Sequence, residues 1–351
     1  MRPERVQAFA PGRVNLIGEH TDYNSGLALP FALDAGVTVI ATRLDVAGPG
    51  WIEAVALDLD EQDTFELESP DRPDRPGWRA FVRGAVAELA ANGVPLGGAR
   101  LEITGTLPQG AGLSSSAALS VALTTALIAL TGAAQPPHVE LARVCSRIEH
   151  DWVGARTGLL DQLASLAGQR DAATLIDFRT LTLAPVPMQL RGWQLVTLDS
   201  GERRTLAGSG YNDRGRECVA AAELMGARSL RVATLEAIQR LPEPLRSRAL
   251  HVAGENVRVR RAAVAIQSGD MPALASLLNA GHESLRDLFE VSTDAVEHAR
   301  RRLLDAGAAG AKLIGGGFGG SVLGLLEPSV PVPAGAAQVG PAAGARVTRL
   351  A

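Results

Sequence analysis

Three glycine-containing segments constrain the fold of this 351-residue chain more than any other feature. They lie at residues 11–24, 105–113 and 315–320, and the third holds five glycines in six residues. Such segments do not continue a helix or a strand, because glycine costs backbone entropy in either element. We therefore expect three loops between regular elements, each allowing the backbone to approach a ligand or another segment closely.

The remaining segments predict a mixture of strands and helices without a strict βαβ rhythm, which favours an α+β fold. Length indicates roughly two domains, at residues 1–175 and 176–351, and the tail at 327–344 is expected to be partly irregular. Strands are predicted at 6–10, 38–43, 99–104, 174–178, 193–199, 311–314 and 321–326, and helices at 78–92, 114–130, 138–154, 214–224, 244–268, 271–283 and 293–306.

Lys312 is the only lysine, so arginine supplies 33 of the 34 basic side chains. A P-loop needs a lysine after its glycines, whereas Lys312 precedes the third glycine segment. Protein-kinase and Schiff-base chemistry would have to use this same lysine, and neither context surrounds it. The sequence therefore excludes the lysine-dependent nucleotide sites.

Composition is that of an ordinary soluble protein, with 46% hydrophobic residues, 21% charged residues and a net charge of −4. A slightly acidic chain is not expected to bind nucleic acid or an anionic membrane, since those surfaces need a clustered basic excess. Cys145 and Cys218 form no disulfide framework. Residues 1–5 lead to no apolar segment of a secretory signal, so a cytoplasmic location is expected.

The second segment, Gly110-Ala111-Gly112-Leu113-Ser114-Ser115-Ser116, continues directly into a predicted helix. Glycines expose backbone N–H groups, and a helix N-terminus carries roughly half a positive charge. Such a place suits a phosphate. An ordinary strand-to-helix turn with a serine N-cap is the alternative interpretation.

The third segment nominally contains the G-x-G-x-x-G pattern of dinucleotide-binding proteins. It joins two predicted strands near the C-terminus, so no βαβ unit with an acidic residue about twenty positions later fits there. A Rossmann site is not expected.

The first segment places Arg13, Glu19, His20 and Asp22 close together, and these side chains offer donors and acceptors for a polyhydroxylated ligand. A surface turn with its own salt bridges is the alternative. Glu19-His20 is not continued as H-E-x-x-H, so metalloprotease chemistry is not expected.

These segments resemble known motifs. Residues 11–24 look like the galactokinase signature, and 110–118 and 311–320 resemble the phosphate-binding loop and the third motif of the wider GHMP kinases. Three shorter stretches also fit galactokinases. The resemblance covers roughly residues 5–326, and the shorter stretches are Gly158-Leu159-Leu160-Asp161-Gln162, Tyr211-Asn212-Asp213-Arg214 with Glu217-Cys218, and residues 282–288.

The resemblance implies a two-domain GHMP kinase fold. An N-terminal ribosomal-protein-S5-like domain would be followed by a C-terminal ferredoxin-like α+β domain, with the active site in the cleft between them. It also implies transfer of the ATP γ-phosphoryl group to the anomeric hydroxyl of α-D-galactose, the first commitment of galactose to the Leloir pathway.

Carried over residue by residue, the resemblance makes Asp161 the catalytic carboxylate, with Arg13 beside it. The sugar would be held by Glu19, His20, Asp22, Tyr211 and the backbone near Gly158. For Tyr211, core packing with a hydrated hydroxyl stays open, and Asp161 either removes the hydroxyl proton or orients the hydroxyl.

The resemblance assigns ATP to Gly110, Ala111, Gly112, Leu113, Ser114, Ser115 and Ser116, with Trp78 near the adenine. Magnesium would be bound by Ser115 or Ser116 together with Glu149, because Mg²⁺ takes few protein oxygens besides phosphates and waters. Core packing for Trp78 and a helix-surface salt bridge for Glu149 are the alternatives.

Several residues depart from the family pattern. Ile314 replaces a usual threonine, Ser321 a common cysteine and Gly215 a second arginine. Loop amides still serve the phosphates, so activity is expected to survive. Lys312 is expected to be structural or a distant electrostatic aid to the phosphates, and replaceable by arginine.

Two other functions stay open. A related kinase would act on another sugar, such as N-acetylgalactosamine or arabinose, and a non-catalytic sugar sensor would use the same fold. Sensors of this kind typically lose phosphate-loop residues, whereas residues 114–118 are complete here. The expected partners are galactose and ATP alone, with the protein a monomer or weak homo-oligomer.

Overall fold

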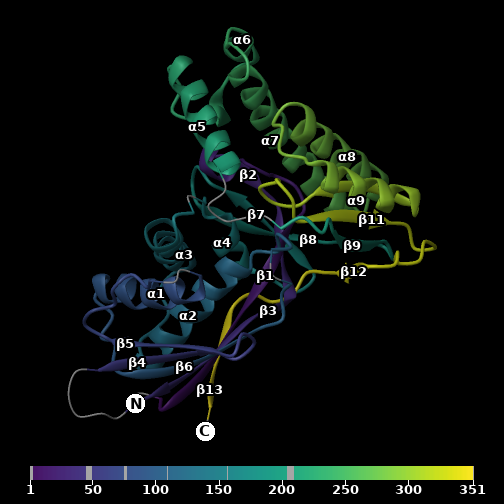
Figure 1. The fold of residues 1–351 in the computed structure, drawn as a ribbon. Coiled ribbons are helices and arrows are strands. Elements are labelled where there is room, and N and C mark those ends of the chain that lie inside the picture. The colour runs from purple at the N-terminus through teal and green to yellow at the C-terminus, as the bar shows by residue number, and fades with distance from the viewer. Residues whose placement is uncertain are drawn as a thin grey trace.

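The computed structural model describes residues 3–44, 50–74, 77–108, 110–155, 157–203 and 209–350, with Ser209 described for its backbone only. Its elements form three sheets with helices packed on them (Figure 1). The fold class is the α+β class expected from the sequence.

The first sheet has six strands in the order β13-β1-β3-β6-β4-β5. Neighbours pair antiparallel except β4 and β6, which are parallel. The C-terminal strand β13 therefore lies beside β1, so the chain returns to its first sheet at its end. The strands are β1 (Arg5–Asn15), β3 (Pro30–Arg43), β4 (Trp51–Ala56), β5 (Glu61–Glu66), β6 (Ala99–Gly105) and β13 (Arg346–Leu350).

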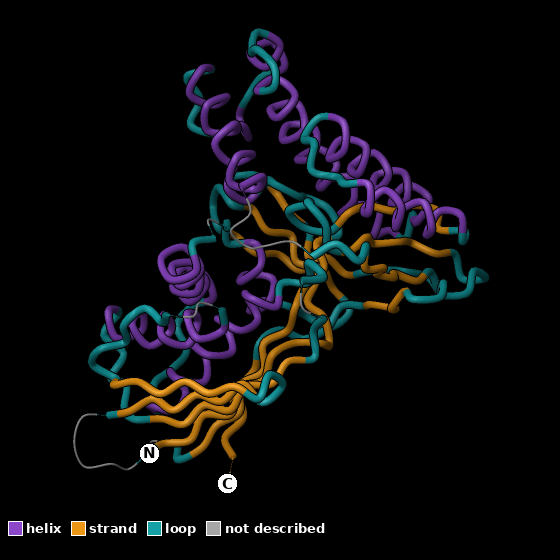
Figure 2. The backbone as a smooth tube through the Cα atoms, in the orientation of Figure 1, coloured by secondary structure: helices purple, strands orange, loops and turns teal. Residues whose placement is uncertain are grey.

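Helices cover one face of this sheet, as Figure 2 shows. The central one is α2, which packs on β1 and β3. Its residues are small or apolar almost all round, so it is buried on nearly every side, as expected for a helix inside a core. The helices of this layer are α1 (Trp78–Ala91), α2 (Ser115–Thr131), α3 (His138–Arg147), which continues as a π-helical turn (Ile148–Val153), and α4 (Leu160–Ala167).

The second sheet is fully antiparallel, in the order β10-β11-β9-β12, and α8 and α9 pack on it. Its helices lie together above it in Figure 1. The strands are β9 (Gln194–Asp199), β10 (Ala308–Leu313), β11 (Ser321–Leu326) and β12 (Ala336–Val339), and the helices of this half are α5 (Ser209–Leu224), α6 (Leu235–Gln239), α7 (Leu245–Ser268), α8 (Met271–Asp287) and α9 (Asp294–Asp305).

A small third sheet, β2-β7-β8, lies between the two larger ones (Figure 1). Its strands are β2 (Leu27–Ala28), β7 (Ala172–Asp177) and β8 (Thr182–Pro187). Strand β8 contains two prolines, which have no N–H to donate to a neighbouring strand. The prolines are tolerated because β8 lies at the edge of its sheet. The division after residue 175 stays a prediction. In the small sheet, β7 and β8 pair directly, so residues before and after the predicted division belong to the same sheet.

Most of the predicted elements appear with boundaries shifted by a few residues, and the differences have physical causes. Strands β4 and β5 were not predicted. For β5, the 61–66 stretch is strongly acidic and satisfies the pattern of an exposed edge strand only weakly. Within the tail at 327–344, Ala336–Val339 forms β12. Cys145 and Cys218 are both buried and free. A search of the described helices finds none with the length and hydrophobicity to cross a membrane.

Candidate active site

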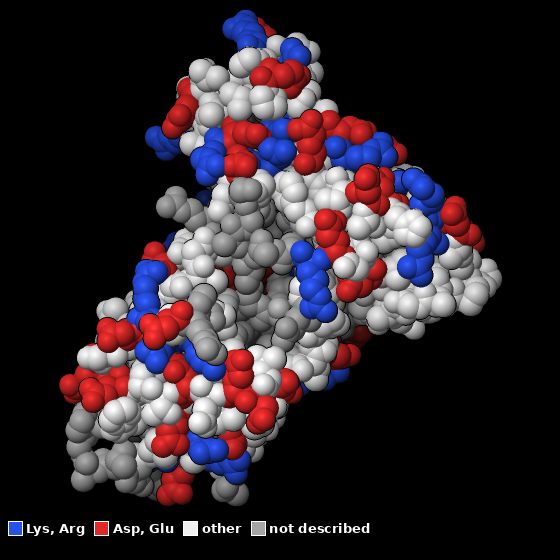
Figure 3. Space-filling model, viewed as in Figure 1, with Lys and Arg blue, Asp and Glu red and all other residues white. Residues whose placement is uncertain are grey.

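A cavity of about 510 Å³ opens where the three glycine segments meet. The space-filling view is hollowed there, between the half that carries the first sheet and the half that carries the second, with acidic side chains visible inside (Figure 3). Twelve of the residues expected at the site line it: Arg13, Glu19, His20, Asp22, Gly110, Gly112, Ser114, Ser115, Ser116, Gly158, Asp161 and Tyr211.

Four expected residues do not line the cavity. Ala111 and Leu113 bury their side chains in the core behind the loop, because the loop alternates between outward glycines and inward apolar groups. Glu149 is buried behind the wall. Trp78 lies at the start of α1, where its indole Nε1 donates to Glu61 at 2.7 Å and Arg79 stacks on its ring. An adenine contact by Trp78 stays a prediction.

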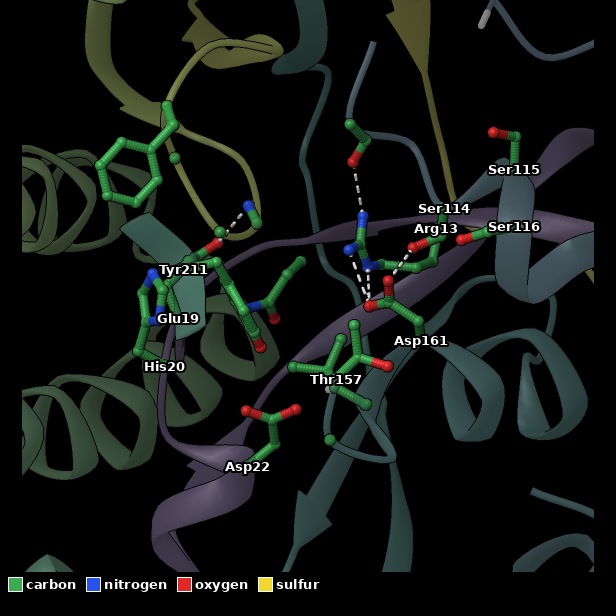
Figure 4. Close-up of a pocket in the computed structure, with 18 of the residues that line it drawn as sticks. Arg13, Glu19, His20, Asp22, Ser114, Ser115, Ser116, Thr157, Asp161 and Tyr211 are labelled. Atoms are coloured by element: carbon green, nitrogen blue, oxygen red, sulfur yellow. Dashed lines mark hydrogen bonds and ion pairs between the residues drawn. The ribbon is translucent and has the colours of Figure 1, made fainter. Parts of the chain in front are cut away.

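The Arg13 guanidinium and the Asp161 carboxylate form the central ion pair of the cavity (Figure 4). The Arg13 Nε donates to Asp161 Oδ1 at 2.7 Å, and Nη1 donates to the carbonyl of Gly112 at 2.8 Å. The Ser114 hydroxyl donates to the other carboxylate oxygen. Two of these hydrogen bonds hold Asp161 directly and the third holds Arg13, while a quarter of the Asp161 side chain stays exposed. A carboxylate held in place and facing open space is suited to accept a hydrogen bond from an incoming hydroxyl group.

The second glycine segment forms a tight loop at the start of α2. Gly110 and Gly112 have φ of +75° and +77°, a conformation that favours glycine. The sequence suggested capping hydroxyls here, but Ser114 sits in the left-handed region and makes no cap hydrogen bond, since its hydroxyl is used on Asp161. The first amides of α2 are therefore not capped by Ser114, and the positive end of the helix faces the cavity.

Glu149 lies in the π-helical turn, 2% exposed. Its Oε2 accepts from the Thr157 hydroxyl at 2.6 Å, and its Oε1 has no hydrogen-bond partner among the described residues. Burial raises the pKa of Glu149 to about 7, with a smaller contribution from the Asp161 charge. A buried carboxylate with an unused oxygen is the kind of group that a cation would complete.

The first glycine segment carries the polar groups of the opposite end of the cavity. Glu19 is fully buried and its Oε1 lies 2.5 Å from the Lys312 Nζ. The same oxygen accepts from the Gly315 amide at 3.3 Å, while Oε2 has no partner among the described residues. Burial raises the pKa of Glu19, and the Lys312 ammonium opposes that shift.

Of the two roles expected for Lys312, the structural one agrees with this ion pair. Lys312 is completely buried on β10, because the strand passes under α8, and its charge compensates Glu19. The sequence did not predict the partner, Glu19, which comes from the opposite end of the chain.

Asp22 and Gly158 touch each other across the cavity floor. A Cβ built on Gly158 would lie 1.9 Å from Asp22 Oδ2, so any side chain at this position would require the Asp22 carboxylate to move. Burial, reinforced by the Asp161 charge, raises the pKa of Asp22 to about 6.

Rings enclose the same end of the cavity. His20 Nδ1 lies 2.7 Å from the Tyr23 hydroxyl, and the His20 ring lies 5.3 Å from that of Tyr211. The Tyr211 ring also meets Tyr23 edge-on. Tyr211 thus both packs on neighbouring rings and lines the cavity, which combines the two interpretations drawn from the sequence.

The third glycine segment closes the cavity beside Glu19. A Cβ on Gly317 would lie 2.4 Å from the Val291 carbonyl, so the loop approaches its neighbour too closely for a side chain. Two of the three departures from the family pattern lie next to this segment, and both are accommodated locally. Ile314 is buried in the core, and the Ser321 hydroxyl donates to the Ala111 carbonyl at 2.7 Å, which ties this segment to the second one.

Sequence reasoning missed several residues that line the cavity. Thr157 could have been found, since it precedes Gly158 and carries a hydroxyl. Asn15 lay inside the signature but was not singled out. The missed lining residues are Asn15, Thr157, Leu160, Arg203, Gly210, Gly315, Gly316, Gly317 and Phe318.

Comparison with family models finds three matches in order along the chain. The galactokinase galactose-binding signature matches residues 2–43, the N-terminal domain of GHMP kinases residues 80–169, and the C-terminal domain of GHMP kinases residues 262–345.

Similar proteins agree with these matches. Galactokinase from Thermotoga neapolitana is 38% identical over 92% of this chain and 89% of its own length. Galactokinase from Mycobacterium tuberculosis is 41% identical over the same shares of the two chains. The crystal structure of Lactococcus lactis galactokinase complexed with galactose superposes with a TM-score of 0.90 at 30% identity, covering 99% of this chain and 95% of that one.

The fold is that of the GHMP kinases, the ATP-dependent small-molecule kinases whose two family domains this chain contains in order. Within that class, the chain belongs to the galactokinase family and has galactokinase activity.

Proposed function

We propose that the chain transfers the γ-phosphoryl group of ATP to the anomeric hydroxyl of α-D-galactose, giving galactose 1-phosphate and ADP. The observation that carries this is the position of Asp161. On one side of it lies the N-terminus of α2, which has no side-chain cap. On the other side lie buried hydrogen-bond donors and acceptors of the kind that bind sugar hydroxyls. Phosphate and hydroxyl groups would meet at that carboxylate.

Asp161 would receive the anomeric hydroxyl. Arg13 holds the carboxylate in place, and its charge also stabilises the negative charge on the transferring group. Because phosphoryl transfer passes through a loose transition state, positioning and electrostatics supply most of the catalysis. The proton of the sugar hydroxyl moves to Asp161 as the bond to phosphorus forms.

ATP would lie with its phosphates against Gly110, Gly112 and the first turn of α2. The residues fit a magnesium ion, since Glu149 has a buried, unused oxygen near Ser116. Glu149 with Ser115 or Ser116 would hold it, and bound Mg²⁺ neutralises charge on the β- and γ-phosphates. The serine hydroxyls and loop amides orient the phosphates towards Asp161.

Galactose would fill the other end of the cavity. Glu19, His20, Asp22 and Tyr211 would bond its hydroxyls, and Gly158 would leave room for the ring against the backbone. The relative from Lactococcus lactis, whose structure was solved with galactose, supports this use of the same fold. An epimer that leaves one buried polar group unpaired loses roughly 1–3 kcal/mol of binding.

The remaining expectations stay proposals. We propose that the protein acts in the cytoplasm as a monomer or weak homo-oligomer, in the Leloir route of galactose catabolism. Its two free buried cysteines suit a reducing compartment.

The test is an ATP-dependent phosphorylation assay across galactose, 2-deoxygalactose, N-acetylgalactosamine, glucose and arabinose. Release of ADP gives the rate, and ³¹P NMR of the product gives the position of the new phosphate. Galactose should have the highest kcat/KM, with an anomeric phosphate product. Faster turnover of another sugar would move the assignment to that sugar, and ADP release from none would indicate a sensor.

A further inference from the structure

Asn15 carries an amide group that the structure leaves without a hydrogen bond. The residue is 1% exposed and lines the cavity. Neither its Oδ1 nor its Nδ2 has a partner among the described residues. None of the roles given above uses it.

Other buried asparagines of the chain are bonded. Asn24 Nδ2 donates to the His20 carbonyl at 2.8 Å. Asn256 accepts from the Leu27 amide at 2.8 Å and donates to the Val252 carbonyl at 2.7 Å. Buried amide groups are nearly always paired in folded proteins, because desolvating them without a partner is unfavourable. Among the described residues, Gln162 is also a buried amide without partners, but it does not line the cavity. Asn15 departs from the rule at a place where a ligand can supply the missing partners.

The position of Asn15 is fixed by β1. It is the last residue of that strand and pairs with Pro30 of β3. Side chains two residues apart on a strand point to the same face, so Asn15 lies on the same side as Arg13, whose guanidinium holds Asp161. Along the chain it stands between the reacting end of the cavity, at Arg13, and the sugar end, which begins at Glu19.

The chemistry of the amide selects the ligand group. Asn15 presents one acceptor and two donor hydrogens. ATP phosphate oxygens only accept, so they would leave Oδ1 unpaired. A sugar hydroxyl both donates and accepts, and neighbouring hydroxyls on one ring can serve both atoms together.

We propose that Asn15 is a further substrate-binding residue, whose amide donates to and accepts from hydroxyl groups of the hexose. This inference rests on the proposed function, because it requires a sugar in that end of the cavity. Asn15 would stabilise the bound sugar in line with Asp161 and take no part in proton transfer.

Replacement by leucine tests the proposal, because leucine has a similar size and no polar atoms. Asn15→Leu should raise the KM for galactose at least tenfold and leave the KM for ATP unchanged. The unliganded variant should melt at the same temperature as the wild type or up to roughly 3 °C higher, since an unpaired buried amide has been removed. A purely structural asparagine would give the opposite sign, a lower melting temperature.

Thr125→Val is the matched control. The Thr125 hydroxyl on α2 is also buried and without a partner among the described residues, but it lies outside the cavity. This variant should gain stability in the same way while its galactose KM stays at the wild-type value. Asn15→Ala provides a second, smaller replacement in case leucine does not fold.

A panel of 2-, 3-, 4- and 6-deoxygalactose identifies the hydroxyl that is bound. The wild type should discriminate against each analogue that lacks a bonded hydroxyl, and Asn15→Leu should lose the discrimination for at least one of them. If the wild type phosphorylates galactose and both Asn15 variants keep its KM, the inference is wrong and the proposed function stands. If the wild type does not phosphorylate galactose, both fail.

Discussion

Two ion pairs connect the first glycine segment to distant parts of the chain, and they differ in exposure. Arg13 and Asp161 lie 2.7 Å apart, with Asp161 a quarter exposed to the cavity. Glu19 and Lys312 lie 2.5 Å apart, and both side chains are 0% exposed. Asp161 faces the open cavity. In the second pair Glu19 lines the cavity wall, while Lys312 is buried behind it under helix α8.

The difference in exposure distinguishes an ion pair suited to catalysis from one suited to holding the structure of the site. A carboxylate that faces the cavity can change its partner during a reaction, whereas a sealed pair cannot be broken without leaving an unpaired buried charge. Arg13–Asp161 is thus suited to turnover. Glu19–Lys312 is suited to holding the sugar end of the cavity, because it fixes Glu19 against the third glycine segment.

The largest effect is expected at Asp161. Asp161→Ala should lower kcat by about 10²–10⁴-fold, the usual contribution of a placed acid–base group. The protein should still fold because Asp161 is partly exposed, but with a lower melting temperature, since Arg13 is 4% exposed and loses its counter-charge. Steady-state rates of ADP release measure kcat, and a thermal melt confirms folding. An Asp161→Ala enzyme with wild-type turnover would refute the role.

Lys312 comes next, with an effect on stability. Lys312→Met keeps the aliphatic stem but leaves Glu19 as an uncompensated buried charge, so the free energy of unfolding should fall by about 3–5 kcal/mol. Urea denaturation measures it. Lys312→Arg is the control, since it keeps the charge and should retain nearly full activity. Equal stability of the Met variant and the wild type would show that the pair contributes nothing.

Glu149 gives a pH-dependent effect on magnesium. Its pKa of about 7 means that protons compete with a cation for the carboxylate below that pH. The Mg²⁺ concentration for half-maximal rate should therefore rise as the pH falls from 8 to 6, by about tenfold per pH unit once below 7. Glu149→Gln should need more magnesium at every pH and lose this pH dependence. An unchanged magnesium requirement would exclude Glu149 as a ligand.

The smallest effect is expected from Asp22 in the acid range. As an ionised acceptor for sugar hydroxyls, it should lose function below its pKa of about 6, so kcat/KM for galactose should fall about tenfold per pH unit there. Asp22→Asn should be weaker at pH 7.5 but flat across the same range.

Unfolding does not account for that acid loss. The pKa of Asp22 is raised on folding, so its contribution to stability is full below about pH 4 and is lost as the pH rises through 6. Protonating Asp22 therefore stabilises the fold while it weakens sugar binding. A melting temperature that falls together with kcat/KM below pH 6 would point to another group.

The sequence predicted the cavity lining well where a motif is contiguous. Arg13, Asp22 and Ser114 each lie in a short contiguous segment, so the conformation of one loop determines where each of them lies. Asp161 reaches Arg13 only through the fold, and the family resemblance alone predicted that contact.

Pairings across the tertiary structure could not be predicted. The contact between Glu19 and Lys312 depends on how β10 passes under α8, and no local pattern encodes it. The unpaired amide of Asn15 is likewise visible only once every neighbour is placed. The edge strand β8 was not predicted, because its two prolines argue against a strand although an edge position tolerates them.

One measurement tests the division of the cavity most directly: titration calorimetry of galactose into Asp161→Asn and Asp22→Asn, beside their kcat values. We predict that Asp161→Asn binds galactose with a Kd within about threefold of the wild type and shows almost no turnover. Asp22→Asn should instead raise the Kd at least tenfold. Equal losses of binding in the two variants would contradict the account.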